Sequence, residues 1–200
     1  MPIFNMVGGG GYKSLGTMWK SVSTLPYNFY GGSAVVLNNE IHILGGVHEG
    51  YSSGFEYHYK WNGSKWESVS TLPDGLKYGQ AVVLNDEIHI LGGSNSSSHY
   101  KWNGSKWESV STLPLPYGFD DGSAVVLNNE IHILGSGDGV ESKYSKRHYK
   151  WNGSQWIDVS TLPHDFYNGS AVVLNDEIHI LGCDAAKQNH EACFNVYTKA

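Results

Sequence analysis

One pattern of hydrophobic and polar residues recurs along this chain. Four apolar residues, AVVL, are followed by a polar pair, Asn-Asn or Asn-Asp, and then by EIHIL, in which isoleucine alternates with polar residues. The block begins at Ala34, Ala81, Ala124 and Ala171, at spacings of 47, 43 and 47 residues. A period of 40 to 50 residues built from strand-like segments predicts an all-β repeat architecture.

Each repeat predicts four short strands, which we name a to d in chain order. Two-residue hairpin turns join a to b and c to d, since Asn-Asn and Asn-Gly pairs tolerate the positive φ that such turns need. In the first repeat the expected strands are Ser33–Asn38, Glu40–Gly45, Tyr57–Trp61 and Lys65–Ser70. Strand a is apolar on both faces, which is typical of a strand covered on both sides.

Two further features carry a resemblance to a known family. A glycine doublet follows strand b at Gly45-Gly46 and Gly92-Gly93, and a tyrosine and a tryptophan lie seven apart in three repeats. The pairs are Tyr59/Trp66, Tyr100/Trp107 and Tyr149/Trp156. This pattern resembles the kelch repeat, which implies an all-β, four-bladed β-propeller of four-stranded antiparallel blades over residues 17–200. Its repeats run over about 32–73, 79–114, 122–163 and 169–200.

The ends of the chain suggest how the ring closes. The last repeat has strands a, b and c (193–198), and the missing strand d has a copy near the N-terminus, WKSVSTLP from Trp19. We therefore expect residues 17–23 to complete the last blade, which would remove the free edges of the ring within a monomer.

Two features lie outside this scheme. Residues 1–16 contain Gly8–Gly11 and predict a flexible leader, or alternatively a docking peptide at residues 1–11 for a larger assembly. Cys183 and Cys193 flank the base of a b–c loop, so a disulfide and two free thiols both remain open.

Composition and charge exclude several classes of function. Thirteen Lys and Arg against nineteen Asp and Glu give a net charge of −6, which argues against nucleic acid as a partner. Apolar runs such as AVVL are too short for membrane insertion, and no signal peptide is recognisable. We find no catalytic constellation and expect no cofactor.

Histidine is abundant, with ten residues, and His42, His89, His132 and His179 occupy the same place in strand b. A metal would need these imidazoles on the axis, whereas strand b is one strand removed from it, so we expect packing and no metal site. Asn-Gly-Ser at Asn62, Asn103 and Asn152 matches a glycosylation sequon, and we interpret it as turn chemistry.

The turns differ in a way that indicates a binding face. The a–b and c–d turns are nearly identical in all repeats, whereas the b–c loops and the d–a connections differ and lie together on the other face of the disc. These segments are rich in Tyr, Phe, Ser, Gly, Asn and Asp, as in binding loops. The candidate ligand-binding residues are Tyr30, Asp74, Tyr78, Tyr117, Phe119, Asp121, Asp165, Phe166 and Tyr167.

We therefore predict a binding module, not an enzyme, that recognises a glycan or a protein or peptide. The leader is faintly similar to the N-termini of small tail-associated proteins of bacterial viruses, which favours a virion-borne or extracellular receptor binder over a cytoplasmic protein. One alternative is a propeller enzyme acting on a sugar. Another is a structural or consensus repeat protein without a ligand, because WNGSKWESVSTLP recurs unchanged at 61–73 and 102–114.

Overall fold

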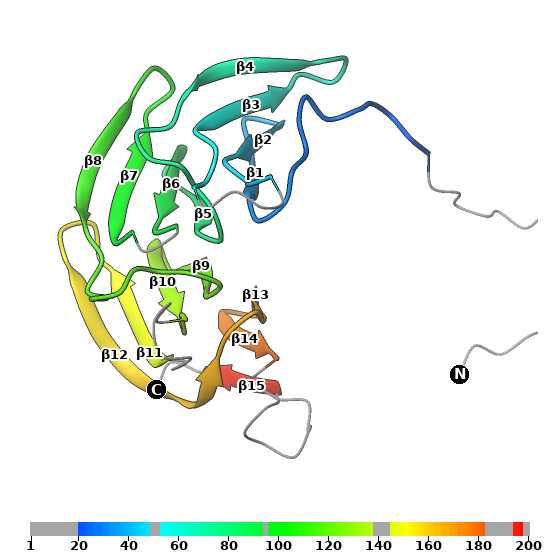
Figure 1. Ribbon diagram of the computed structural model, residues 1–200. Helices are drawn as coiled ribbons and strands as arrows, with labels where there is room; N and C mark the ends of the chain where they lie inside the picture. Colours follow the sequence, from blue (N-terminus) through cyan, green and yellow to red (C-terminus); the bar gives the residue numbers. More distant parts are fainter. Residues whose placement is uncertain (1–19, 49–52, 94–95, 138–144, 183–193, 198–200) are drawn as a thin grey trace, which may run out of the picture.

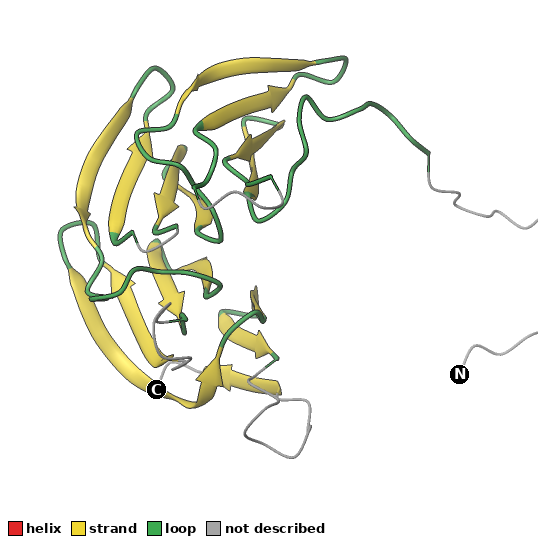
Figure 2. Ribbon diagram, viewed as in Figure 1, coloured by secondary structure: helices red, strands yellow, loops and turns green. Residues whose placement is uncertain are grey.

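The computed structural model describes residues 20–48, 53–93, 96–137, 145–182 and 194–197, which form strands and loops (Figure 2). The strands fall into four antiparallel sheets in chain order, three of four strands and a last one of three. Blade 1 contains β1 (Ser33–Leu37), β2 (Glu40–Leu44), β3 (Tyr57–Trp61) and β4 (Trp66–Thr71); blade 2 contains β5 (Gln80–Leu84), β6 (Glu87–Leu91), β7 (Ser98–Trp102) and β8 (Trp107–Thr112). Blade 3 contains β9 (Ser123–Leu127), β10 (Glu130–Leu134), β11 (Ser145–Trp151) and β12 (Trp156–Phe166); blade 4 contains β13 (Ser170–Leu174), β14 (Glu177–Leu181) and β15 (Phe194–Tyr197).

The blades stand side by side around an axis, with β1, β5, β9 and β13 innermost (Figure 1). This confirms the predicted all-β, four-bladed β-propeller. The strands a to d of the sequence are the successive strands of each blade, and their bounds agree with the expected ones to within a residue or two in the first repeat.

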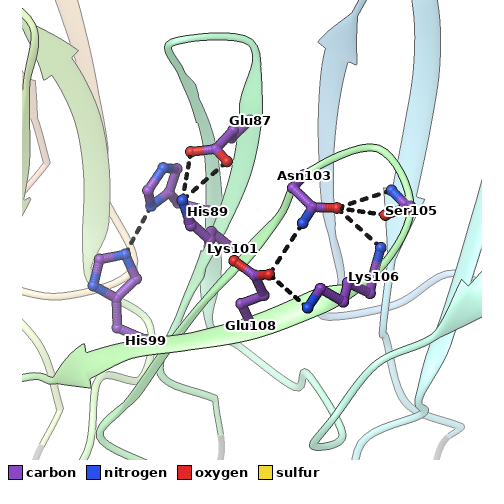
Figure 3. Close-up of polar contacts among 8 residues, drawn as sticks. All are labelled: Glu87, His89, His99, Lys101, Asn103, Ser105, Lys106 and Glu108. Carbon is purple, nitrogen blue, oxygen red and sulfur yellow. Dashed lines mark hydrogen bonds and ion pairs between the residues drawn. The ribbon is translucent and has the colours of Figure 1, made fainter.

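The tight turns follow from their side chains. Asn38 and Asn39 have φ of 51° and 63°, as the a–b hairpin requires. At the c–d turn of blade 2, Asn103 Oδ1 accepts hydrogen bonds from the backbone amides of Ser105 and Lys106, at 3.0 and 3.1 Å (Figure 3). Asn62 and Asn152 do the same in blades 1 and 3, so the interpretation of Asn-Gly-Ser as turn chemistry is confirmed.

The core lies between neighbouring blades. Strand residues alternate between two faces, so Val82, Leu84 and Leu91 of blade 2 point toward blade 3, whose Ile131 and Trp151 pack against them. The contacts between blades 1 and 2 and between blades 3 and 4 use residues at the same places in the repeat. We call the face toward the next blade the forward face and the other the back face. Both faces of an inner blade are covered, which explains why strand a is apolar throughout.

Polar side chains also link the outer strands of adjacent blades. The indole Nε1 of Trp107, on β8, donates to Ser70 Oγ on β4 at 3.0 Å, and Trp156 Nε1 donates to Ser111 Oγ at the same distance. The repeated tryptophan of strand d therefore fixes blades 2 and 3 to a serine of the blade before each.

Histidines of strands b and c form buried pairs beneath these links. In blade 2, His89 Nδ1 lies 2.8 Å from His99 Nε2 (Figure 3). His99 Nδ1 in turn lies 2.9 Å from Ser111 Oγ. Blades 1 and 3 contain the equivalent pairs His42/His58 and His132/His148. The packing role expected of the strand b histidines is confirmed for His42, His89 and His132, whereas their pairing with strand c was not foreseen.

Burial keeps the paired imidazoles neutral. It lowers the pKa of His58 and His99 to about 3 and that of His89, His132 and His148 to about 4, and it lowers the pKa of His42 as well. The cause is the cost of placing a cation in a blade core, to which the neighbouring histidine adds in the cases of His58, His99 and His148.

The closing strand is the part of the expected fold that the described residues do not show. Lys20–Ser23 form no strand, and β15 pairs only with β14 among the described residues. Blades 1 and 4 are the two ends of an open arc (Figure 1). The physical reason is the curvature set by the three packed interfaces, which leaves β15 away from the N-terminal segment. Residues 1–19, Cys183 and Cys193 lie outside the described residues, as do the predictions of a leader, a docking peptide and a disulfide.

The histidine pairs predict loss of stability in acid. An unfolded histidine binds a proton below about pH 6.5, whereas the buried ones stay neutral down to about pH 3 to 4. Between these pH values the unfolded state binds more protons than the folded state. The free energy of unfolding therefore decreases by about 1.4 kcal/mol for each such histidine when the pH is lowered by one unit. Urea unfolding between pH 7.5 and 4.5 measures the slope.

A variant tests the assignment of that slope. The double variant His89→Phe, His99→Phe removes one histidine pair. Its free energy of unfolding should depend less steeply on pH than that of the parent protein, even if the substitutions change the stability at pH 7.5. His48→Gln, at an exposed site, serves as the control and should keep the steepness of the parent protein. An unchanged slope in the double variant would contradict the burial of neutral histidines.

Candidate functional site

The b–c loops and the d–a connections meet on one face of the propeller. The Val47 amide donates to the Tyr30 carbonyl at 2.7 Å, and the Phe119 amide donates to the Ser96 carbonyl at 3.0 Å. Each bond joins a b–c loop to a d–a connection, so the predicted grouping of the variable segments is confirmed. We call this surface the variable face.

Four equivalent residues form the rim of the axis on this face. Gly31, Tyr78, Asp121 and Asn168 have φ of 63°, 61°, 54° and 52°. Backbone hydrogen bonds connect them in sequence order, because each amide donates to the carbonyl of the preceding member. The distances are 2.7 Å from Tyr78 to Gly31, 2.9 Å from Asp121 to Tyr78 and 2.8 Å from Asn168 to Asp121. A positive φ is uncommon for tyrosine, and such strained residues concentrate at functional sites.

The side chains at this rim make an aromatic and acidic group, the axial cluster of Tyr30, Lys77, Tyr78, Asp121 and Tyr167. The rings of Tyr30 and Tyr78 meet edge to face with centroids 6.0 Å apart, and Lys77 Nζ lies 5.1 Å from the centre of the Tyr78 ring. A hydrogen bond with Tyr30, aided by burial, raises the pKa of Tyr78 to about 12. Burial raises the pKa of Asp121, against the opposing effects of a hydrogen bond from Tyr167 and the charge of Lys77.

Away from the axis, each d–a connection lies against strand c of the following blade. Before blade 1, Tyr27 packs on Tyr57 and Tyr59, with centroids 4.9 and 5.7 Å apart, and donates to the Gly45 carbonyl at 2.7 Å.

Before blade 2, Asp74 accepts hydrogen bonds from Tyr100 Oη and Ser98 Oγ, at 3.0 and 3.2 Å. These two equivalent places are therefore occupied by the protein's own side chains.

The third of these places holds a cavity of about 450 Å³. It lies between the connection from β8 to β9 and the edge of blade 3 formed by β11 and β12. Its wall contains the ring of Tyr117 and the charged side chains of Lys146, Arg147, Asp158 and Asp165. The rest of the wall includes Leu115, Ser136, Ser145 and Thr161.

Two of the charged side chains in this cavity are departures from the repeat. Asp158 stands opposite Tyr149 where the other blades have Ser68 and Ser109, and Arg147 stands where they have Tyr57 and Ser98. Arg147 Nη1 donates to Tyr149 Oη at 2.8 Å, which holds the guanidinium at the wall. Sequence analysis missed both residues, although the change from WESVS to WIDVS was a visible signal.

The structure divides the nine predicted site residues into four groups. Tyr30, Tyr78, Asp121 and Tyr167 meet in the axial cluster, and Tyr117 and Asp165 line the cavity. Asp74 is bound to blade 2.

Phe119 and Phe166 are wrong as surface residues, because they are 0% and 1% exposed. Their rings fill the space beside Gly122 and Gly169, and this packing anchors the connections.

Within the described ranges, no group of three or more His, Cys, Asp or Glu side chains is arranged to hold a metal ion. The part of the chain that the structure describes also contains no helix long and apolar enough to cross a membrane.

Comparisons with known proteins bear on the fold. No protein-family model and no curated protein matches the chain, so the resemblance to kelch repeats stays a prediction. Among solved structures, the chain is similar to the one titled "Structure of YjhT", with a TM-score of 0.73 and 12% identity over 90% of this chain and 70% of that chain. At this identity the likeness supports the β-propeller fold alone.

Two neighbouring aromatic residues give a test of this division of the site. Phe119→Ala should cost about 3–5 kcal/mol of unfolding free energy because it empties a filled core position, whereas Tyr117→Ala should change it by less than about 0.5 kcal/mol. Phe119→Leu is the matched control and should be tolerated, since Leu76 occupies the same place in the preceding connection. Urea unfolding measures all three, and equal costs for Tyr117 and Phe119 would contradict the assignment.

Proposed function

We propose that this protein is a binding module that takes a glycan in the cavity beside Tyr117. The observation that carries the proposal is the contrast among three equivalent places on the variable face. Two are filled by Tyr27 and Asp74 with their partners, and the third is a cavity in which Arg147 and Asp158 depart from an otherwise strict repeat.

The lining suits a ligand with many hydroxyl groups. Tyr117 is 57% exposed and offers an amphipathic ring that loses little conformational entropy on binding. Asp158 and Asp165 accept hydrogen bonds from hydroxyl groups, and Arg147 donates them. A site that combines acceptors, donors and an aromatic surface matches a sugar better than it matches an apolar ligand or a simple ion.

The axial cluster extends this binding surface. Tyr30, Tyr78 and Tyr167 place three aromatic side chains at the axis on the same face, held by backbone bonds and by Asp121. A longer glycan, or a protein that bears one, would contact both. Recognition of a peptide is the alternative that this cluster favours, because tyrosine-rich rims bind proteins as readily as sugars.

We propose binding without catalysis. Asp158, the carboxyl group that departs from the repeat, is exposed to solvent, whereas catalytic carboxyl groups commonly lie in places from which water is excluded. A receptor-binding role at a virion or cell surface fits such a module and agrees with the faint similarity of the leader to viral tail proteins.

A glycan array followed by calorimetry with the strongest hit tests the proposal. Tyr117→Ala should weaken binding by about 1–3 kcal/mol, roughly 5- to 150-fold in Kd. Asp158→Ser, which restores the residue of the other blades, should weaken it comparably.

Two controls separate the cavity from the rest of the surface. Lys106→Ala changes the opposite face, where its side chain is exposed, and Ser109→Asp places the carboxylate at the equivalent position of blade 2; both should leave Kd unchanged. An array without hits, or equal losses from Lys106→Ala and Tyr117→Ala, would overturn the proposal.

A further inference from the structure

The two ends of the arc present apolar surfaces that the inner blades bury. On the forward face of blade 4, Val172 and Leu174 are 47% and 56% exposed, whereas their counterparts in blade 2, Val82 and Leu84, are 7% and 6% exposed. Leu181 is also exposed, although the equivalent Leu91 is fully buried. We call this surface the blade 4 end.

The back face of blade 1 is the complementary surface, the blade 1 end. Val36 and Ile41 are 63% and 43% exposed there, while Ile88, the counterpart of Ile41 in blade 2, is fully buried. Each end carries one half of the contact that joins blades 1 and 2, 2 and 3, and 3 and 4.

The blade 1 end already holds a strand d segment. Ser21, Val22, Ser23 and Leu25 line a cavity with Ile41, Trp61 and Trp66. In the next blade the counterparts of Val22 and Leu25, which are Val69 and Leu72, pack on Ile88, Trp102 and Trp107. The N-terminal segment therefore lies where the outer strand of a preceding blade belongs.

The following residues keep the same register. Phe29 lies against Gly32 as Phe119 lies against Gly122 and Phe166 against Gly169. The strand that this segment lacks is a strand c, and β15 is a strand c whose outer edge has no partner among the described residues.

The backbone chain at the axis also has two loose ends. It runs from Gly31 through Tyr78 and Asp121 to Asn168 by three hydrogen bonds, and no bond between described residues joins Asn168 to Gly31. The fourth bond would run from the Gly31 amide to an Asn168 carbonyl across the gap between the two ends.

We propose that a second copy of this chain fills the gap, so that two arcs join head to tail in a ring of eight blades. The Lys20–Ser23 segment of each copy pairs with β15 of the other and completes its blade 4. Heterologous contacts of this kind close into a ring when the rotation permits it.

The close packing of the inner interfaces favours a second copy over closure within one chain. Bringing blade 4 onto blade 1 of the same chain requires a sharper bend at all three packed interfaces, whose side chains are close to fully buried, and close-packed cores resist such changes. Joining two arcs adds contacts of the kind that the three inner interfaces already make. The sequence predicts a closed monomer instead, and the experiment below distinguishes that monomer from the dimer.

The binding face gains from this assembly as well. Tyr30 belongs to the blade 1 end and Tyr167 to the connection before blade 4, so the two loose ends of the rim would meet those of the second copy. The inference does not depend on the glycan proposal, because its readout is the pairing of strands.

Cysteine pairs test the strand pairing directly. Lys60 faces Glu67 and Lys101 faces Glu108 across strands c and d, and the same register pairs Val196 with Lys20. In a Cys183→Ser, Cys193→Ser background, one chain carries Lys20→Cys and a differently tagged chain carries Val196→Cys, and the two are co-expressed and oxidised. We expect a covalent dimer that contains both tags.

Matched variants decide between the alternatives. Lys101→Cys with Glu108→Cys lies inside blade 2 and should crosslink within one chain, while Lys20→Cys alone should give no covalent dimer. Light scattering of the unaltered protein should give twice the chain mass of 22.0 kDa. A mass of one chain, together with a crosslink only when Lys20→Cys and Val196→Cys are in the same chain, would overturn the inference in favour of closure within the monomer.

Discussion

A propeller blade has two apolar faces, and only a neighbouring blade can cover them. This requirement explains the strict repetition of AVVL and EIHIL, because every inner strand must match the same surface on both sides. It also explains the tryptophan of strand d, whose indole reaches back to Ser70 or Ser111 of the preceding blade. The same requirement leaves the first and last blades with an uncovered face.

Repetition in the strands confines variation to the segments that do not pack between blades. The a–b and c–d turns are fixed by their asparagines, so sequence and length vary mainly in the b–c loops and the d–a connections. The cavity beside Tyr117 arises in this way: one connection is longer than its counterparts, and blade 3 carries Arg147 and Asp158 where other blades carry neutral residues. A rigid repeating frame with one altered place is a suitable support for a binding site.

Local chemistry was predictable from the sequence, and longer-range geometry was not. Strands and turns follow from alternation and from Asn-Gly pairs, and the tyrosines of the variable face were recognised as a group. Phe119 and Tyr117 lie two residues apart in one connection, and only the fold shows that the first fills a space beside Gly122 while the second is exposed. The pairing of His89 with His99 depends on the register of two strands and on a bulge next to His99, and ring closure depends on the curvature that three interfaces produce together.

The histidine pairs show how the end of the arc differs from its interior. In blade 2, Leu91 is paired with His99, which continues the chain of bonds to Ser111; in blade 4 the equivalent Leu181 is paired with Phe194, so the sequence itself breaks that chain. A strand d added beside β15 would bring Ser23 to the place of Ser70. Its hydroxyl could then accept a hydrogen bond from the Trp66 indole, but the neighbouring strand c has Phe194 in place of a histidine. The contact between the two ends is thus mainly apolar, whereas the inner interfaces bury neutral imidazoles that acid disfavours. Acid should therefore weaken the inner interfaces more than the contact between the ends.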